Sequence, residues 1–195
     1  MAAVRCSTEA VATGQSVGMT PRIVVVSGAP GTGKSTLAGV IADRLQLPLL
    51  SVDLIKEALG DALGLGDESW SDRVGDAAAE VVFRLAASLP SAVVEGWWRR
   101  ERRMRAVREF KGCVQVFCRC DPSLAQQRMR ARLNGSRHPI HRDVINPAIV
   151  DGMAAMVTAV DPLDLGGKLV EVDTTEPYDA DVIADRVRAA LLLST

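Results

Sequence analysis

The chain has 195 residues, 48% of them hydrophobic, and its 23 basic and 24 acidic side chains give a net charge of −1. A chain of this length buries roughly 70% of its unfolded surface, so it needs no metal or disulfide framework to fold. The composition excludes disordered and low-complexity classes for most of the chain, and its apolar runs are far shorter than the roughly 18 residues of a membrane span. We expect one soluble domain over residues 21–195.

Residues 1–20 show no apolar periodicity and lack the continuous apolar core of a secretory signal. We therefore expect a disordered N-terminal tail, and Met19 offers an alternative start just before the first predicted strand.

The chain has four cysteines, which are Cys6, Cys113, Cys118 and Cys120. They form no CxxC pair, and this usage favours a reducing, cytoplasmic setting without disulfides. The last two cysteines and the pair His138-x-x-His141 could together ligate zinc, and packing of the cysteines in the core is the alternative.

From residue 22 onward, short apolar runs alternate with longer segments of helical periodicity. This alternation predicts an α/β fold, with strands parallel in one sheet and helices on both of its faces. The expected strands span residues 23–27, 49–52, 92–95, 113–118 and 169–172. The expected helices span residues 34–45, 53–63, 74–89, an Arg-rich segment after 99, a segment that begins behind Asp121-Pro122, 146–160 and 179–193.

The most specific motif follows the first strand. It is Gly28-Ala29-Pro30-Gly31-Thr32-Gly33-Lys34-Ser35, a full match to GxxxxGK[ST], and Thr36 follows it. Glycines allow a tight turn in which backbone N–H groups and the helix N-terminus bind the β- and γ-phosphates of a nucleotide. Lys34 supplies a mobile positive charge for those phosphates, and Ser35 supplies a hydroxyl ligand for Mg²⁺.

The loop and the segments after it resemble the adenylate-kinase-like group of P-loop phosphotransferases, over residues 22 to about 193. This group includes shikimate kinase, gluconate kinase, chloramphenicol phosphotransferase and bacterial AAA-family ATP-binding proteins. The resemblance implies a P-loop NTPase three-layer sandwich with strand order 2-3-1-4-5, a site for ATP and Mg²⁺, and a mobile lid that carries arginines. It also implies that the γ-phosphate of ATP moves to a hydroxyl group of a small molecule.

Polar residues follow the ends of predicted strands, where ligands bind in open α/β sheets. By the resemblance, Asp53 takes the proton of the acceptor hydroxyl, and a helix N-cap is its alternative role. Glu95 resembles a strand-end acid that holds Mg²⁺, and contact with the acceptor or with an arginine stays open as its alternative role. Thr174 resembles a residue of the loop on which the adenine ring rests, and an ordinary turn is the alternative. The residues expected to bind the acceptor are Asp53, Lys56, Glu95, Trp97, Trp98 and Arg99. Solvent exposure of the lysine and core packing of either tryptophan are the alternatives.

Basic residues concentrate between positions 99 and 142, where thirteen bases, twelve of them Arg, accompany three acids. The net charge of −1 is therefore the sum of a block of +10 and a remainder of −11. Arg128 and Arg132 share one helix face, and Arg137 lies in the polar loop 134–143 that resembles the kinase lid. By the resemblance, all three bind or stabilise the triphosphate, and Arg128 and Arg137 are the expected catalytic arginines beside Lys34.

Two other functions stay open. The Arg-rich block is compatible with an RNA-end kinase or a nucleotide-dependent RNA binder. A nucleotide-gated regulatory protein would need no acceptor at all. The identity of the acceptor and the oligomeric state do not follow from the residues.

Overall fold

Residues 22–98, 107–110, 112–135 and 137–193 are described in a computed structural model of the chain. The predicted N-terminal tail, Arg99 and most of the Arg-rich segment that follows it lie outside these ranges.

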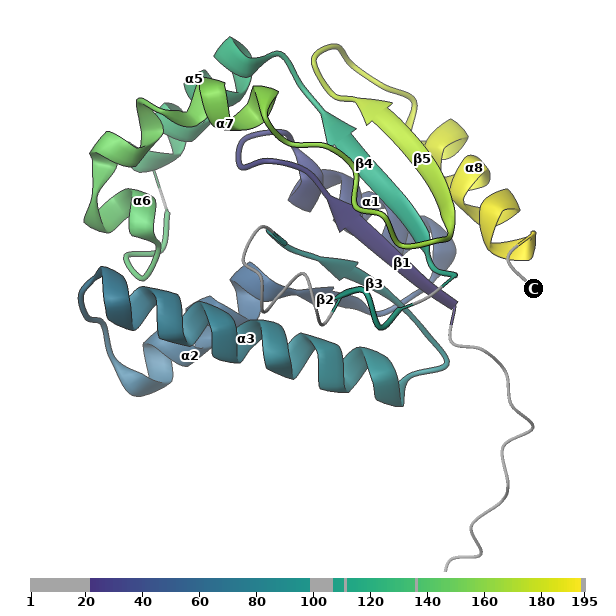
Figure 1. Ribbon diagram of the computed structural model, residues 1–195, viewed down its shortest axis with the longest axis horizontal. Helices are drawn as coiled ribbons and strands as arrows, with labels where there is room; N and C mark the ends of the chain where they lie inside the picture. Colours follow the sequence, from purple (N-terminus) through teal and green to yellow (C-terminus); the bar gives the residue numbers. More distant parts are fainter. Residues whose placement is uncertain (1–21, 99–106, 111, 136, 194–195) are drawn as a thin grey trace, which may run out of the picture.

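Five parallel strands form one sheet in the described part of the chain (Figure 1). The strands are β1 (Arg22–Ser27), β2 (Leu49–Ser51), β3 (Ser91–Glu95), β4 (Val114–Arg119) and β5 (Lys168–Asp173). Their order is β2-β3-β1-β4-β5, which confirms the predicted 2-3-1-4-5 arrangement. In the central strand, Val24 is aligned with Val93 of β3 on one side and with Val114 of β4 on the other. The carboxyl ends of all five strands therefore lie along one edge of the sheet.

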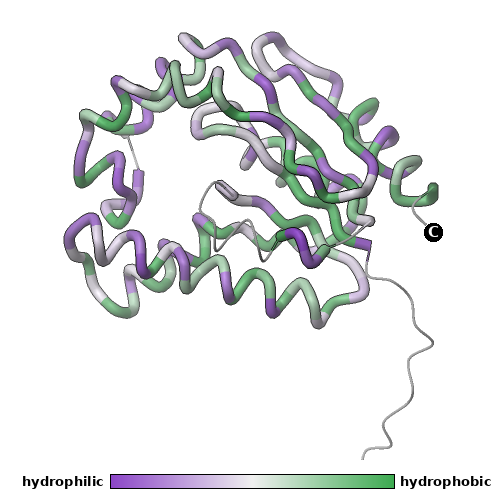
Figure 2. The backbone as a smooth tube through the Cα atoms, in the orientation of Figure 1, coloured by the Kyte–Doolittle hydropathy of each residue, from purple (hydrophilic) through white to green (hydrophobic). Residues whose placement is uncertain are grey.

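Helices cover both faces of the sheet, as predicted (Figure 1). They are α1 (Lys34–Leu45) and α8 (Ala180–Leu192) on one face, and α2 (Val52–Leu63) and α3 (Glu68–Ser88) on the other. Successive side chains of a strand point to opposite faces, so Ile23 and Val25 pack toward α3 while Val24 and Val26 pack toward α1 and α8. Figure 2 shows hydrophobic strands between these layers. In the described ranges, no helix has both the length and the apolar character that a bilayer crossing requires.

The chain after β4 forms an arch that reaches from the sheet toward α2 and α3 (Figure 1). Its elements are α5 (Pro122–Leu133), α6 (Arg142–Ile145), the 3₁₀ helix η1 (Pro147–Val150) and α7 (Met153–Thr158). A separate apolar cluster joins the arch to the phosphate loop, and it includes Ala29, Met129 and Met153.

The single helix predicted over 146–160 is wrong, because the segment is interrupted at Asp151 and Gly152. The Gln126 side-chain amide donates to the carbonyls of Val150 and Asp151, at 3.0 Å each. These contacts with α5 satisfy the two carbonyls without a continuous helix. Gly152 is then the N-cap of α7.

The predicted lid loop packs against α2 and α3 from residue 137 onward. Ile140 lies over Gly60 in the middle of α2, where an added Cβ atom would be 2.6 Å from Ile140 Cδ1. The Ile140 carbonyl also accepts a hydrogen bond from Ser71 Oγ on α3 at 2.6 Å. Glycine at position 60 is therefore a condition for the close contact between this loop and α2.

Substitution of two helical glycines tests this contact. Alanine is favoured over glycine inside a helix by about 0.5–1 kcal/mol. Gly39→Ala on α1 should raise the free energy of unfolding by that amount, because an added Cβ meets no atom within 4 Å. Gly60→Ala should lower it by about 1 kcal/mol or more, because Ile140 has to move. Denaturant unfolding measures the free energy of unfolding of both variants. An equal increase in the two variants would contradict the close contact between Ile140 and Gly60.

Candidate functional site

The phosphate loop joins β1 to α1 at the carboxyl edge of the sheet (Figure 1). Gly31 has a φ of +83°, and an added Cβ atom would lie 2.4 Å from the Ala125 carbonyl oxygen of α5, so this position requires glycine. Gly33 precedes α1 and supplies no side-chain cap. The first N–H groups of α1 are therefore left for an anion, as the predicted phosphate site requires.

Glu95 connects the phosphate loop to the ends of two strands. Its Oε1 accepts a hydrogen bond from Ser35 Oγ at 3.1 Å and lies 3.2 Å from Lys34 Nζ. Its Oε2 accepts from Ser51 Oγ at 2.7 Å. The side chain is only 1% exposed, so these donors compensate a charge that burial would otherwise penalise. The structure thus brings together the two predicted metal ligands, and Glu95 pairs with a lysine instead of an arginine.

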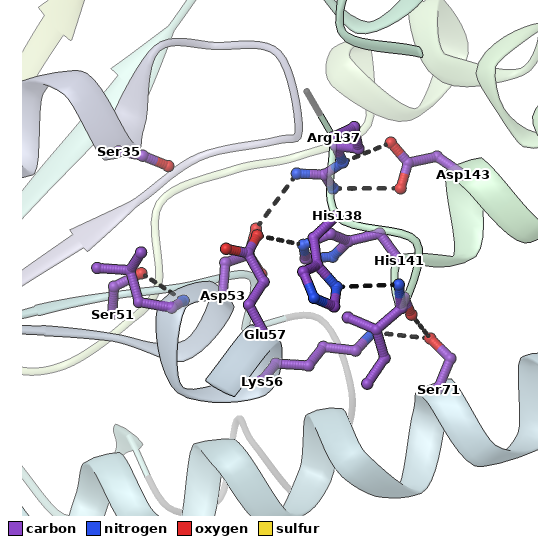
Figure 3. A network of polar contacts seen from close by, with 12 residues as sticks. Ser35, Ser51, Asp53, Lys56, Glu57, Ser71, Arg137, His138, His141 and Asp143 are labelled. Atoms are coloured by element: carbon purple, nitrogen blue, oxygen red, sulfur yellow. Dashed lines mark hydrogen bonds and ion pairs between the residues drawn. The ribbon is translucent and has the colours of Figure 1, made fainter. Parts of the chain in front are cut away.

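Asp53 lies in the first turn of α2 and faces Arg137 of the lid loop (Figure 3). The N-cap of α2 is Ser51, whose Oγ accepts from Leu54 N at 3.5 Å, so capping is not the role of Asp53. Arg137 Nη1 lies 3.8 Å from Asp53 Oδ2. Burial by itself raises the pKa of Asp53, but attraction from nearby cations, chiefly Lys34, outweighs it and lowers the pKa below the ordinary value of 3.8. Asp53 is therefore ionised at neutral pH.

The three candidate arginines have different surroundings. Arg137 donates to both Asp143 oxygens, from Nε at 2.9 Å and from Nη2 at 3.1 Å. Arg128 donates from Nη2 to the carbonyl of Thr174 at 3.0 Å, next to the predicted adenine loop. Arg132 makes no hydrogen bond or ion pair through its guanidinium with the described residues, and burial and repulsion from Arg137 lower its pKa.

Two cavities meet at Asp53. The first has a volume of about 660 Å³, and we call it the Ser35 cavity; its lining includes Ser35, Ser51 and Glu95. The second has a volume of about 210 Å³, and we call it the Lys56 cavity; its lining includes Lys34, Lys56 and Trp97. Three residues line both cavities, namely Asp53, Arg132 and Arg137. Arg128 lines neither cavity.

Lys56 and Trp97 both lie where a small molecule could contact them. The solvent-exposed alternative for Lys56 is wrong, because the side chain is buried and its Nζ donates to Ser71 Oγ at 2.7 Å (Figure 3). Trp97 is half-buried at the end of β3. Its side chain is therefore neither fully in the core nor fully in solvent.

Trp98 packs in the core, which was the alternative to a contact with the acceptor. Its side chain is 2% exposed, and its Nε1 donates to the carbonyl of Val26 at 3.3 Å. Its ring packs against Phe83 of α3 with a centroid separation of 5.5 Å. Trp98 thus belongs to the core, and Arg99 beside it lies outside the described residues.

Other polar residues complete the site without having been predicted. Glu57 Oε1 accepts from buried His141 Nε2 at 2.7 Å, and Asp143 holds Arg137 (Figure 3). Glu57 is four residues after Asp53, so helical spacing could have placed both carboxylates on one face. No local pattern in the sequence predicts the pairing of Asp143 with Arg137, because the fold of the lid loop brings the two side chains together.

A zinc site made by the two histidines and two cysteines is not present in the structure. Cys118 is buried in β4, where desolvation raises the pKa of its thiol to about 12. His138 and His141 instead face α2, where their Nε2 atoms lie near Asp61 and Glu57. In the described ranges, no group of three or more His, Cys, Asp or Glu side chains is arranged to hold a metal ion.

The sequence profile of an AAA domain, AAA_33, matches residues 23–149. The chain belongs to this AAA-domain family. The match contains the phosphate loop, Asp53, Glu95 and the lid arginines, and it confirms the predicted resemblance to P-loop small-molecule kinases. A comparison with curated protein sequences found no match.

Solved structures similar to this AAA-domain protein include a candidate kinase from Chloroflexus aurantiacus J-10-fl. It is 34% identical with a TM-score of 0.79, and the match covers 88% of this chain and 98% of that one. A gluconokinase from Sinorhizobium meliloti 1021 has 18% identity, a TM-score of 0.55 and coverage of 90% and 93%. Shikimate kinase from Acinetobacter baumannii, in complex with shikimate, has 17% identity, a TM-score of 0.53 and coverage of 91% and 96%. The last two show a shared fold.

The buried His141 makes the stability of this AAA-domain protein depend on pH. Burial lowers its pKa below 6.5, and Asp53 and the hydrogen bond to Glu57 offset only part of this effect. Below about pH 6.5 the His141 imidazole therefore binds a proton in the unfolded chain but stays neutral in the folded chain until the pH is lower. The free energy of unfolding consequently falls as the pH falls below about 6.5. His141→Gln should cost about 1 kcal/mol at neutral pH and flatten the curve of Tm against pH. Parallel curves for the two proteins would contradict this assignment.

Proposed function

We propose that this AAA-domain protein is an ATP- and Mg²⁺-dependent kinase that phosphorylates a hydroxyl group of a small molecule. The observation that carries the proposal is the pair of cavities that share Asp53, Arg132 and Arg137. A γ-phosphate in the Ser35 cavity and an acceptor in the Lys56 cavity would meet at one carboxylate and two guanidinium groups. Those are the groups that phosphoryl transfer uses for alignment and charge stabilisation.

The residues around the phosphate loop fit a triphosphate and a magnesium ion. The uncapped N-terminus of α1 and the Lys34 ammonium suit phosphate oxygens. Ser35 Oγ and the Glu95 carboxylate are hard oxygen ligands that already lie 3.1 Å apart. Bound Mg²⁺ would neutralise negative charge on the phosphates and help to align them.

Asp53 is the residue that would orient the acceptor. A new bond forms between the acceptor oxygen and the γ-phosphorus while the bond from that phosphorus to the bridging oxygen of ADP breaks. The hydroxyl proton passes to the Asp53 carboxylate. A lowered pKa makes Asp53 a weak base, but the loose transition state requires mainly that the hydroxyl be held in line.

Arg132 and Arg137 would both stabilise the transferring phosphoryl group, but to different extents. Arg137 is already neutralised by Asp143, and its Nη1 is 3.8 Å from Asp53. Arg132 has no such counter-ion among the described residues, so its charge is available for the equatorial oxygens. This assignment moves the main catalytic role from Arg128 to Arg132.

The alternative of an RNA-binding groove gains no support from three arginines of the basic block. Arg130 pairs with Asp151 at 2.9 Å, Arg119 pairs with Glu171, and Arg142 pairs with Glu68. Because these three guanidinium groups are compensated by acids, they do not contribute to the uncompensated stripe that a phosphate backbone requires.

Asp53→Asn tests the proposed function. It keeps the shape of the side chain but removes the charge and the proton acceptor, so phosphoryl transfer should fall at least about 100-fold while the affinity for ATP changes little. Mass spectrometry of acceptor mixtures incubated with ATP and Mg²⁺ detects the product, and Lys34→Ala serves as the inactive control. Asp43→Asn, an exposed acid on α1, is the matched control and should keep full activity. An unchanged rate in Asp53→Asn would remove this carboxylate from the mechanism.

Alanine substitutions along α5 separate the roles of the arginines. Arg132→Ala should reduce kcat by about 10³-fold or more, the scale expected for a dedicated transition-state arginine. Arg128→Ala should instead raise the KM for ATP with a smaller change in kcat, because it lies beside Thr174. Arg130→Ala, an exposed residue on the same helix, is the control. The reverse order of kcat losses would restore Arg128 as the catalytic arginine.

A further inference from the structure

Both polar and apolar side chains line the Lys56 cavity. Asp53 is one of the polar residues, and a hydroxyl group would be phosphorylated beside it. The apolar part of the lining consists of large side chains from α5, η1, α7 and the end of β3, which are Trp97, Met129, Ile149, Met153 and Met156. An acceptor that fills this cavity therefore has to present an apolar surface to these residues.

The apolar part of the lining is continuous with the cluster that joins the arch to the phosphate loop. Met129 and Met153 are each 2% exposed and belong to that cluster, and Trp97, Ile149 and Met156 are partly buried against it. These side chains are fixed by packing behind them and reach the cavity with one surface. Methionine is polarizable and adapts to the shape of a ligand, and an indole ring offers a flat apolar surface. The methionine and isoleucine side chains cannot replace the hydrogen bonds that a sugar hydroxyl loses when it leaves water.

We infer, on the basis of the proposed function, that the acceptor is an alcohol with an apolar or aromatic group. Its hydroxyl group lies at Asp53, and its apolar group packs against Trp97 and the methionines. Trp97 is the residue that selects this class of acceptor, because its half-buried ring forms part of the cavity lining.

Matched pairs of alcohols test the inference on the full chain. The pairs are glycerol with 2-phenylpropane-1,3-diol, and glucose with phenyl β-D-glucoside; gluconate and shikimate are the anionic comparators. Each compound is incubated with ATP and Mg²⁺, and mass spectrometry measures the product. Each is also titrated into the protein in the presence of a non-hydrolysable ATP analogue, and calorimetry measures binding. In each pair, the phenyl compound should bind at least about ten-fold more tightly than its polar counterpart, and both anions, which lack a phenyl group, should bind more weakly than the phenyl compounds.

Variants at Trp97 test whether this residue binds the phenyl group of the acceptor. Trp97→Ala should weaken binding of the phenyl compounds about ten-fold or more and leave binding of the ATP analogue unchanged. Trp97→Phe keeps an aromatic ring and should restore most of the affinity, which separates recognition from loss of folding. Trp70→Ala, on α3 and outside the cavity lining, is the matched control.

The outcomes separate the inference from the proposed function. Binding of phenyl compounds that depends on Trp97, without any product, supports the inference and counts against the kinase activity. Phosphorylation of glycerol, glucose or an anion in preference to the phenyl compounds overturns the inference and leaves the kinase activity standing. Binding of no compound by a protein that still binds the ATP analogue also overturns the inference, as does phenyl binding that Trp97→Ala leaves intact.

Discussion

The arrangement of the site depends on one buried charge, the carboxylate of Glu95. At 1% exposure it is stable only with donors on both oxygens, and these come from the phosphate loop and from the end of β2. Loss of one partner from such a buried pair costs about 3–5 kcal/mol, which is a large share of the stability of a domain. The contacts of Lys34, Ser35 and Ser51 with Glu95 therefore bind three strand ends together. Asp53 follows two residues after Ser51, so its position is set by the same junction.

The charge segregation seen along the chain becomes charge pairing in space. Arginines of the basic block meet acids from the acidic remainder, as in the pairs Arg119–Glu171 and Arg142–Glu68. Single exposed pairs of this kind contribute at most about 1 kcal/mol each to the free energy of unfolding. Arg132 has no such partner in the described ranges, and it lines both cavities. The near-zero net charge is thus compatible with a guanidinium that no described acid compensates, at the point where a phosphoryl group would pass.

Patterns that are local in the chain were sufficient to predict the sheet, the flanking helices and the phosphate loop, because each depends on periodicity or on a short motif. The fates of Trp98 and Arg128 were not predictable in this way. Trp98 Nε1 finds its acceptor on Val26, 72 residues earlier, and Arg128 finds Thr174, 46 residues later. Adjacent tryptophans thus differ in burial, since Trp97 is half-buried and Trp98 packs in the core at 2% exposure. Long-range partners decide such roles, and no spacing in the sequence encodes them.

Both cavities are bounded by α2 on one side and by the lid loop on the other, so their geometry depends on how that loop docks. The contacts of this loop with α2 include Ile140 over Gly60, His141 with Glu57 and His138 with Asp61, and the Ile140 carbonyl accepts a hydrogen bond from Ser71 of α3. Each hydrogen bond of this kind contributes about 1 kcal/mol, far less than the junction at Glu95. The 3.8 Å separation between Arg137 and Asp53 is therefore a property of the docked lid. The phosphate loop and Asp53 keep their places through the sheet, whereas the arginine that faces Asp53 keeps its place only while these weak contacts hold.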